Sequence, residues 1–130
     1  MRSIMRKQYH LVPTATAFHA WDVDKLITLT KDFEVMEVKV LDLLESNPFH
    51  WYQGDNLPTS KSVFDHMILV NACSLEYPII LSAEGRIMDG MHRVGKAYIN
   101  DHELIKAVKF EKTPDPDFYD VFPDDLSYER

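Results

Sequence analysis

The sequence predicts an α+β fold in which a small mixed sheet is flanked by helices. Residues 34–40 alternate polar and apolar side chains, as a half-buried strand does. Residues 60–73 instead place apolar side chains at helical spacing, behind a Thr-Ser pair that can cap a helix. Residues 78–110 have the pattern of a strand, a turn, a strand, a helix and a strand. Interleaved strands and helices of this kind predict helices packed against a sheet.

Length and composition predict one domain. A chain of 130 residues with 45% hydrophobic residues can bury one ordinary core and is too short for two comfortable ones. We expect a single domain over residues 1–130, with an N-terminal extension (1–20) and an acidic, aromatic C-terminal tail (111–130). No stretch reaches the roughly eighteen apolar residues of a membrane span, and no apolar segment follows the first basic residues, so we expect a cytoplasmic protein without membrane contact.

The charge is unevenly distributed. The chain carries −7 in total, and residues 111–130 hold seven acids against two bases, which places −5 in the tail and −2 on the rest. Affinity for a nucleic-acid backbone comes largely from Lys and Arg. The charge distribution therefore disfavours direct DNA binding.

The first half of the chain contains one clear helix and one clear strand. Residues 1–20 show weak periodicity, and we expect them to be irregular or to form an edge. Asp22 is a candidate N-cap for a helix that ends at Lys31. The strand at 34–40 follows, and then a short helical turn at 41–45.

The loop over residues 47–60 is rich in aromatic side chains. It contains Pro48, Gly54 and Pro58, yet also Phe49, His50, Trp51 and Tyr52. Such a loop is either a packed flap or a wall that faces a ligand, and the sequence leaves both interpretations open.

A helix and the central motif follow this loop. We expect the helix to begin after Thr59 or Ser60 and to bury a wide apolar stripe, made of Val63, Phe64, Met67, Ile68 and Val70. Strands at 79–82 and 86–88 should pair through a hairpin turn at 83–86. A helix from Met91 and a strand at 104–110 complete the pattern.

The helix after Asp89-Gly90 has an unusual first part. Helix N-termini favour acids, because the free N–H groups carry partial positive charge, yet His92, Arg93 and Lys96 lie within the first two turns. A shared anion would explain this clustering of basic side chains. Gly90 would allow a sharp turn and close approach of the ligand to the backbone. The turn from Asp89 to Arg93 is therefore a candidate phosphate site.

Several of these residues also have ordinary structural interpretations. Asp89 could cap the helix by accepting the N–H of His92, or act as a general base or metal-positioning carboxylate. Arg93 could pair with an acid on the neighbouring helix. His66, on the helix before the motif, is either a surface or interface histidine or a nucleotide contact.

The motif resembles the ParB/sulfiredoxin superfamily. The resemblance spans about residues 36–110 and is carried by Tyr77-Pro78-Ile79-Ile80-Leu81, the turn at Gly85, and Ile87-Met88-Asp89-Gly90-Met91-His92-Arg93. It implies a ParB/sulfiredoxin-like fold that binds a nucleotide, ATP, ADP or CTP with Mg²⁺, with the phosphates at this turn. In sulfiredoxin the residue before the His-Arg pair is the catalytic cysteine. Met91 stands there, which excludes sulfinic acid reduction because a thioether cannot replace a thiolate.

The motif is closest to that of the ADP-dependent free-serine kinase, which reads Asp-Gly-His-His-Arg. Asp89, Gly90, His92 and Arg93 match it, and Met91 replaces the first His. The resemblance implies that Asp89 is a catalytic base. Partitioning proteins read closer to Gly-Glu-Arg-Arg and append a DNA-binding domain for which this chain has no room.

Two functions follow from the sequence. The first is a small phosphotransferase or nucleotide hydrolase with Asp89 and His92 as catalytic residues, no protein metal-ligand set, and a phosphate or nucleotide site formed by Gly90, Met91, His92, Arg93, Lys96 and His66. The second is a non-catalytic module in which a bound nucleotide or phosphorylated small molecule regulates association with a protein partner or a second copy. The aromatic tail, through Tyr119, Phe122 and Tyr128, could then dock on a second subunit or cover the site.

Overall fold

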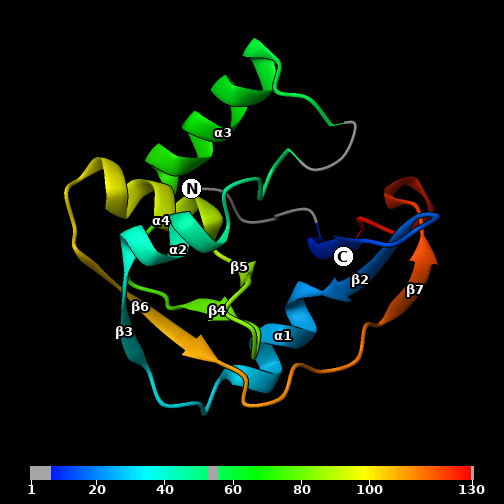
Figure 1. The fold of residues 1–130 in the computed structure, drawn as a ribbon, viewed down its shortest axis with the longest axis horizontal. Helices are drawn as coiled ribbons and strands as arrows, with labels where there is room; N and C mark the ends of the chain where they lie inside the picture. The colour runs from blue at the N-terminus through cyan, green and yellow to red at the C-terminus, as the bar shows by residue number, and fades with distance from the viewer. Residues whose placement is uncertain (1–6, 53–55, 130) are drawn as a thin grey trace. The chain divides into compact units, whose positions relative to one another are not determined.

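The computed structural model describes residues 7–52 and 56–129, which form two compact units (Figure 1). One unit combines the chain up to Lys31 with the segment from Pro114 onward, and the other runs from Asp32 to Thr113. Each contains helix and strand, so the α+β class is confirmed. Within the described ranges, every helix is too short or too polar to cross a bilayer.

The first unit is built on a three-stranded antiparallel sheet that joins the two ends of the chain. Its strand order is β1-β2-β7, so β1 is an edge strand and β2 is central. The C-terminal tail supplies the third strand of this sheet. The unit consists of β1 (Tyr9–Pro13), β2 (Phe18–Asp22), α1 (Val23–Thr30), β7 (Phe118–Val121) and a 3-10 turn, η1 (Pro123–Asp125).

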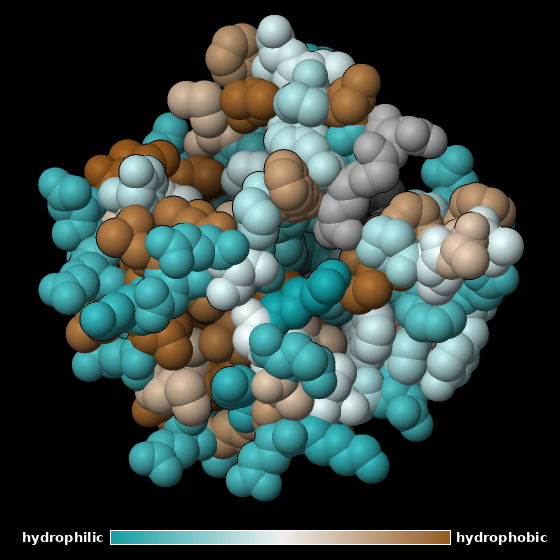
Figure 2. Space-filling model, viewed as in Figure 1, coloured by the Kyte–Doolittle hydropathy of each residue, from teal (hydrophilic) through white to brown (hydrophobic). Residues whose placement is uncertain are grey.

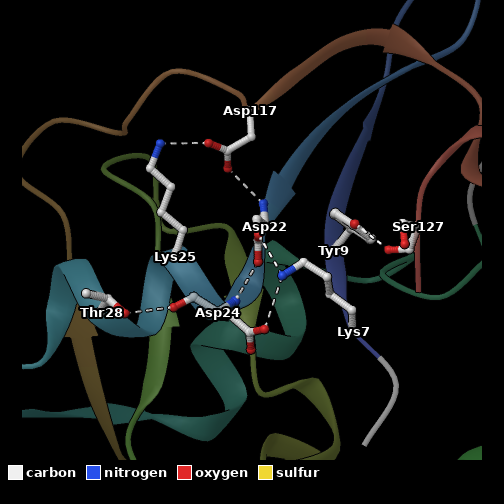
Figure 3. Close-up of polar contacts among 8 residues, drawn as sticks. All are labelled: Lys7, Tyr9, Asp22, Asp24, Lys25, Thr28, Asp117 and Ser127. Atoms are coloured by element: carbon white, nitrogen blue, oxygen red, sulfur yellow. Dashed lines mark hydrogen bonds and ion pairs between the residues drawn. The ribbon is translucent and has the colours of Figure 1, made fainter. Parts of the chain in front are cut away.

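Polar contacts fix the start of α1 (Figure 3). The predicted N-cap is confirmed, because Asp22 Oδ1 accepts the N–H of Asp24 at 2.9 Å. Lys7 pairs with both carboxylates, at 2.9 and 3.2 Å. The tail residue Asp117 accepts the N–H of Asp22 and pairs with Lys25, both at 2.8 Å. Three acids, Asp22 and Asp24 near the start of α1 and Asp117 of the tail, are therefore held in ion pairs with Lys7 or Lys25.

The second unit contains a four-stranded mixed sheet of order β3-β6-β4-β5. The β4 and β6 strands are parallel, and the other two pairs are antiparallel. The predicted mixed sheet is confirmed, including the hairpin between β4 and β5. The strands are β3 (Met36–Lys39), β4 (Ile79–Leu81), β5 (Ile87–Asp89) and β6 (Leu104–Lys109).

Helices α2 (Val40–Ser46) and α4 (Met91–Ile99) pack on this sheet, and α3 (Ser60–Ala72) packs on α4 (Figure 1). Burial of apolar area is the main favourable term here, at roughly 25 cal/mol per Å². The core of the unit comes from both helices and three strands: Val40, Leu43, Ile79, Leu81, Ile87, Val94, Ala97, Ile105 and Ala107.

A buried asparagine closes the outer edge of β5. Asn47 Nδ2 donates to the carbonyl of Leu43 at 2.9 Å, and Asn47 Oδ1 accepts the N–H of Ile87 at 3.1 Å. An unpaired strand edge in the core would otherwise leave buried donors unsatisfied. Asn47 thereby connects the end of α2 to the strand that leads into the Asp89–Arg93 turn.

Helix α3 departs from its prediction in one respect. Its capping is confirmed, since Thr59 Oγ1 accepts the N–H of Ser62 at 3.1 Å. Its apolar stripe, however, is not part of the core: Val70 is the buried residue of α3, whereas the other members of the expected stripe, Val63, Phe64, Met67 and Ile68, are exposed. The reason is that α3 packs on another helix and not on the sheet, so only a narrow strip of its surface is covered.

Candidate functional site

The candidate site begins where β5 passes into α4. Gly90 links them with φ +108°, in the left-handed region that L residues avoid. A Cβ on this residue would lie 2.5 Å from Ile79 Cγ2 and 2.8 Å from Arg93 Nη2. The fold itself thus requires glycine here, and the space beside it is filled by protein atoms.

The first turn of α4 has no side-chain cap. Gly90 is the N-cap residue, so the expectation that Asp89 caps the helix by accepting the N–H of His92 is wrong. The reason is geometric: Asp89 is the last residue of β5, one position too early, and its carboxylate lies toward Arg93. The leading N–H groups of a helix need acceptors, and in α4 none comes from a capping side chain among the described residues.

Arg93 pairs with Asp89 and not with an acid on the neighbouring helix. Arg93 Nη2 donates to Asp89 Oδ2 at 3.2 Å and to the carbonyl oxygen of Pro78 at 3.3 Å. Both charged side chains are less than one-fifth exposed. Arg93 Nε is buried without a hydrogen-bond partner among the described residues. The turn therefore contains a partly buried, internally neutralised ion pair.

Lys96 has a structural partner at the other end of α3. Its Nζ donates to the carbonyls of Cys73, at 2.6 Å, and Asn71, at 3.2 Å. A cation at a helix C-terminus complements the partial negative charge of the last carbonyls. The structure therefore does not bring the Lys96 ammonium to the first turn of α4.

Two histidines that the sequence singled out lie together. His66 Nδ1 and His92 Nε2 are 2.9 Å apart, so one ring donates a hydrogen bond to the other. Burial, followed by the nearby His66, His50 and Arg93, lowers the pKa of His92 to about 4. Burial also lowers the pKa of His66. The pair is therefore uncharged at neutral pH and acts through hydrogen bonding, not as a cation.

The aromatic loop completes this cluster. The ring of Trp51 stacks on His66 at 3.8 Å between centroids and 6° between planes. It lies 5.0 Å from the His92 ring, and Tyr52 meets His66 edge-on. Burial lowers the pKa of nearby His50 as well. We call Trp51, Tyr52, His66 and His92 the imidazole-tryptophan cluster.

The sequence identifies this cluster only in part. It points to His66 and His92 as site residues, whereas it marks Trp51 and Tyr52 only as members of an aromatic loop. The usable signal was the density of aromatic residues in a loop with Pro and Gly, and Gly54 lies outside the described residues. Met91, in contrast, packs against the core beneath α4, a structural role that its place in the motif did not reveal.

The site offers hydrogen-bond donors, a flat ring system and one ion pair. Neutral imidazoles can donate or accept, depending on the tautomer, and free helix N–H groups only donate. In the part of the chain that the structure describes, no group of three or more His, Cys, Asp or Glu side chains is arranged to hold a metal ion. The arrangement is therefore suited to binding a polar ligand that has both an anionic and a planar part.

Comparison with protein-family models, curated proteins and solved structures finds no match to this chain. The resemblance to the ParB/sulfiredoxin superfamily therefore rests on the motif alone.

Proposed function

We propose that the chain binds a nucleotide or another phosphorylated small molecule at the first turn of α4. One observation carries this proposal: an uncapped helix N-terminus lies beside the imidazole-tryptophan cluster, because His92 belongs to both. The helix N-terminus provides hydrogen-bond donors for phosphate, and the cluster provides a flat surface for a planar base.

The phosphate would be held by backbone and side-chain donors. Helix N-termini bind anions because their N–H groups are free and the helix dipole favours negative charge. His92, uncharged at neutral pH, can donate from one ring nitrogen. Arg93 would contribute by sharing its guanidinium between Asp89 and the ligand, which is feasible because a guanidinium has five donors.

The base would stack on Trp51. This ring already accepts a planar heterocycle, His66, in parallel contact at 3.8 Å. Stacking of a base on an aromatic side chain is worth about 1–3 kcal/mol and tolerates different bases. We therefore expect affinity for ATP, ADP and CTP with modest preference among them.

Mg²⁺ would accompany the phosphates. It usually binds through phosphate oxygens, several waters and one or two carboxylates. Asp89 is the carboxylate of the turn, so it is the residue that would hold the ion with the ligand.

Calorimetry with ATP, ADP, CTP and inorganic phosphate, each with Mg²⁺, tests this binding. Trp51→Ala should lower the affinity for the nucleotides about 10-fold or more and leave the affinity for phosphate unchanged, because only the base stacks. Arg93→Ala should lower the affinity for all four ligands. Lys106→Ala removes one exposed cation from β6 and is the matched control. Absence of heat with every ligand, together with unshifted amide resonances of residues 91–93, would contradict the proposal.

Phosphotransfer is a second candidate, favoured by the position of Asp89 at the last residue of β5, directly before the uncapped turn. In this mechanism Asp89 takes the proton of an acceptor hydroxyl while Arg93 and His92 stabilise the transferred phosphoryl group. The test is nucleotide consumption, which Asp89→Asn should abolish and Asp65→Asn, an exposed control on α3, should leave intact. Binding without any turnover by the wild-type chain would instead support the non-catalytic module.

A further inference from the structure

Helix α3 presents an apolar surface that its own unit leaves uncovered. Phe64 is 60% exposed, Met67 50% and Ile68 65%, and Val63 and Leu69 are exposed as well. Figure 2 shows brown, hydrophobic side chains along α3 at the top of the view. We call the four residues Val63, Phe64, Met67 and Ile68 the α3 face, because helical spacing places them side by side, with Leu69 beyond the Lys61–Asp65 pair. Contiguous apolar patches of this kind on a protein surface commonly mark an interaction site.

We propose that the α3 face pairs with the α3 face of a second copy of this chain, forming a symmetric dimer. The proposal is independent of the nucleotide site, which lies toward the opposite, α4-facing side of α3 through His66. It also differs from the expectation that the aromatic tail is the docking surface.

The area of the α3 face suits such a dimer. A standard interface buries about 800 Å² per partner, of which roughly 65% is apolar in homodimers, or about 500 Å². Phe64, Met67 and Ile68 are 50–65% exposed and Val63 is 37% exposed, so these side chains would supply the apolar centre of such an interface. Helix α3 has thirteen residues, so the polar residues beside the face would form the rim.

The charge of α3 favours a second copy over other partners. Its charged residues are Lys61 and Asp65, whose Nζ and Oδ2 pair at 2.6 Å, so the helix is neutral. The whole chain carries −7, which makes two copies repel except through a neutral surface. Interfacial membrane helices are instead rich in Lys and Arg on the polar face, and α3 has one. A neutral, apolar helix matches another copy of itself.

Two-fold symmetry gives a specific arrangement. In an isologous contact, residue i of one subunit meets residue j of the other, and j meets i. Phe64 and Ile68 are one helical turn apart, so an antiparallel crossing between them places Phe64 against the partner subunit's Ile68 twice. The Lys61–Asp65 pair then stays at the rim.

The test is the mass of the full chain in solution. Sedimentation equilibrium of the wild type over a concentration series should give a dimer, twice 15.2 kDa. Ile68→Asp and Phe64→Asp should each raise the dimer dissociation constant by about 30-fold or more, as expected for central interface residues. Leu41→Asp, which changes an equally exposed apolar residue on α2, is the control and should leave the dimer intact.

A cross-linking experiment removes the dependence on a charged substitution. In a Cys73→Ser background, a mixture of Phe64→Cys and Ile68→Cys chains should form the mixed intermolecular disulfide under mild oxidation, because the proposed crossing brings these two positions together. A mixture of Phe64→Cys and Leu41→Cys chains should not. A monomeric wild type would overturn the proposal. A dimer that persists in both aspartate variants, with far-UV circular dichroism showing folded protein, would also overturn it.

Discussion

Helices α3 and α4 lie against each other but use their apolar residues differently. Helix α4 buries Val94 and Ala97 in the sheet core, and its exposed residues, Tyr98 and Ile99, lie in its last turn. Helix α3 is longer and more uniformly apolar, yet among its residues only Val70 is classed as buried. The comparison shows that hydrophobic content alone does not place a helix in the core. The sheet offers one face to α2 and α4, and α3 is left to pack on α4.

Three contacts join α3 and α4, and they follow the same order along both helices. His66 bonds to His92, Val70 packs on Gly95, where a Cβ would lie 3.3 Å from Val70 Cγ2, and the end of α3 is held by Lys96. Gly95 costs helix stability of roughly 1 kcal/mol relative to Ala, which the close approach of α3 offsets. Helix α4 is therefore both a core element and the support of α3.

The largest effect should come from the start of α4. Gly90→Ala places a Cβ in contact with Ile79 and forces an L residue into φ +108°, so we expect a loss of about 3 kcal/mol or more in unfolding free energy. Gly85→Ala is the control, because φ is +84° there but no atom lies within 4 Å of the added Cβ. Its cost should be about 1–2 kcal/mol. Urea denaturation measures both, and equal losses would show that Ile79 yields without cost.

The next largest effect is the loss of unfolding free energy when a buried α4 residue is truncated, compared with truncation of an exposed α3 residue. Val94→Ala removes two fully buried methyl groups and should cost about 2 kcal/mol. Ile68→Ala, on the exposed α3 face, should cost less than about 0.5 kcal/mol in dilute protein, where a dimer dissociates. Denaturation at two protein concentrations checks this. A large, concentration-independent loss in Ile68→Ala would mean that α3 is buried within the chain.

The contact between the helices should make stability depend on pH. The folded pKa of His92 is about 4, below its ordinary value of 6.5, so the unfolded chain binds a proton first. Stability from this group is complete above pH 6.5 and is lost as the pH falls through 4. Because the site is partly open to solvent, we expect about 1 kcal/mol, less than the full shift implies.

His92→Gln should flatten this part of the curve when unfolding is followed between pH 7.5 and 4.5. His66 and His50 have pKa shifts of the same sign, so some dependence will remain. An NMR titration in which His92 protonates near pH 6.5 would contradict the assignment.

The smallest effect concerns the far end of α3. Lys96→Met removes the donor to the carbonyls of Cys73 and Asn71 and should cost about 0.5–1 kcal/mol. Hydrogen exchange should rise in the last turn of α3 in this variant. Lys106→Met, on an exposed strand position, should change neither quantity.

The sequence predicts which residues belong to the candidate site better than it predicts their charge states and partners. The motif located Asp89 to Arg93, and His66 was named from its place on the preceding helix. The expectation that three cations surround the first turn was not met, because Arg93 faces Asp89, Lys96 faces α3, and His92 is uncharged. Those partners come from packing, since the pKa of His92 depends on burial and on residues far away in sequence.

What the sequence determined by itself was local. The caps at Asp22 and Thr59, the alternation in β3 and the hairpin between β4 and β5 depend on residues within a few positions of one another, so periodicity and turn chemistry identified them. What only the tertiary structure decided was non-local. It paired the C-terminal strand with the N-terminal hairpin, brought Trp51 to His66 and left the α3 face uncovered. Each of these depends on which surfaces meet, and a sheet face that two helices already cover cannot bury a third.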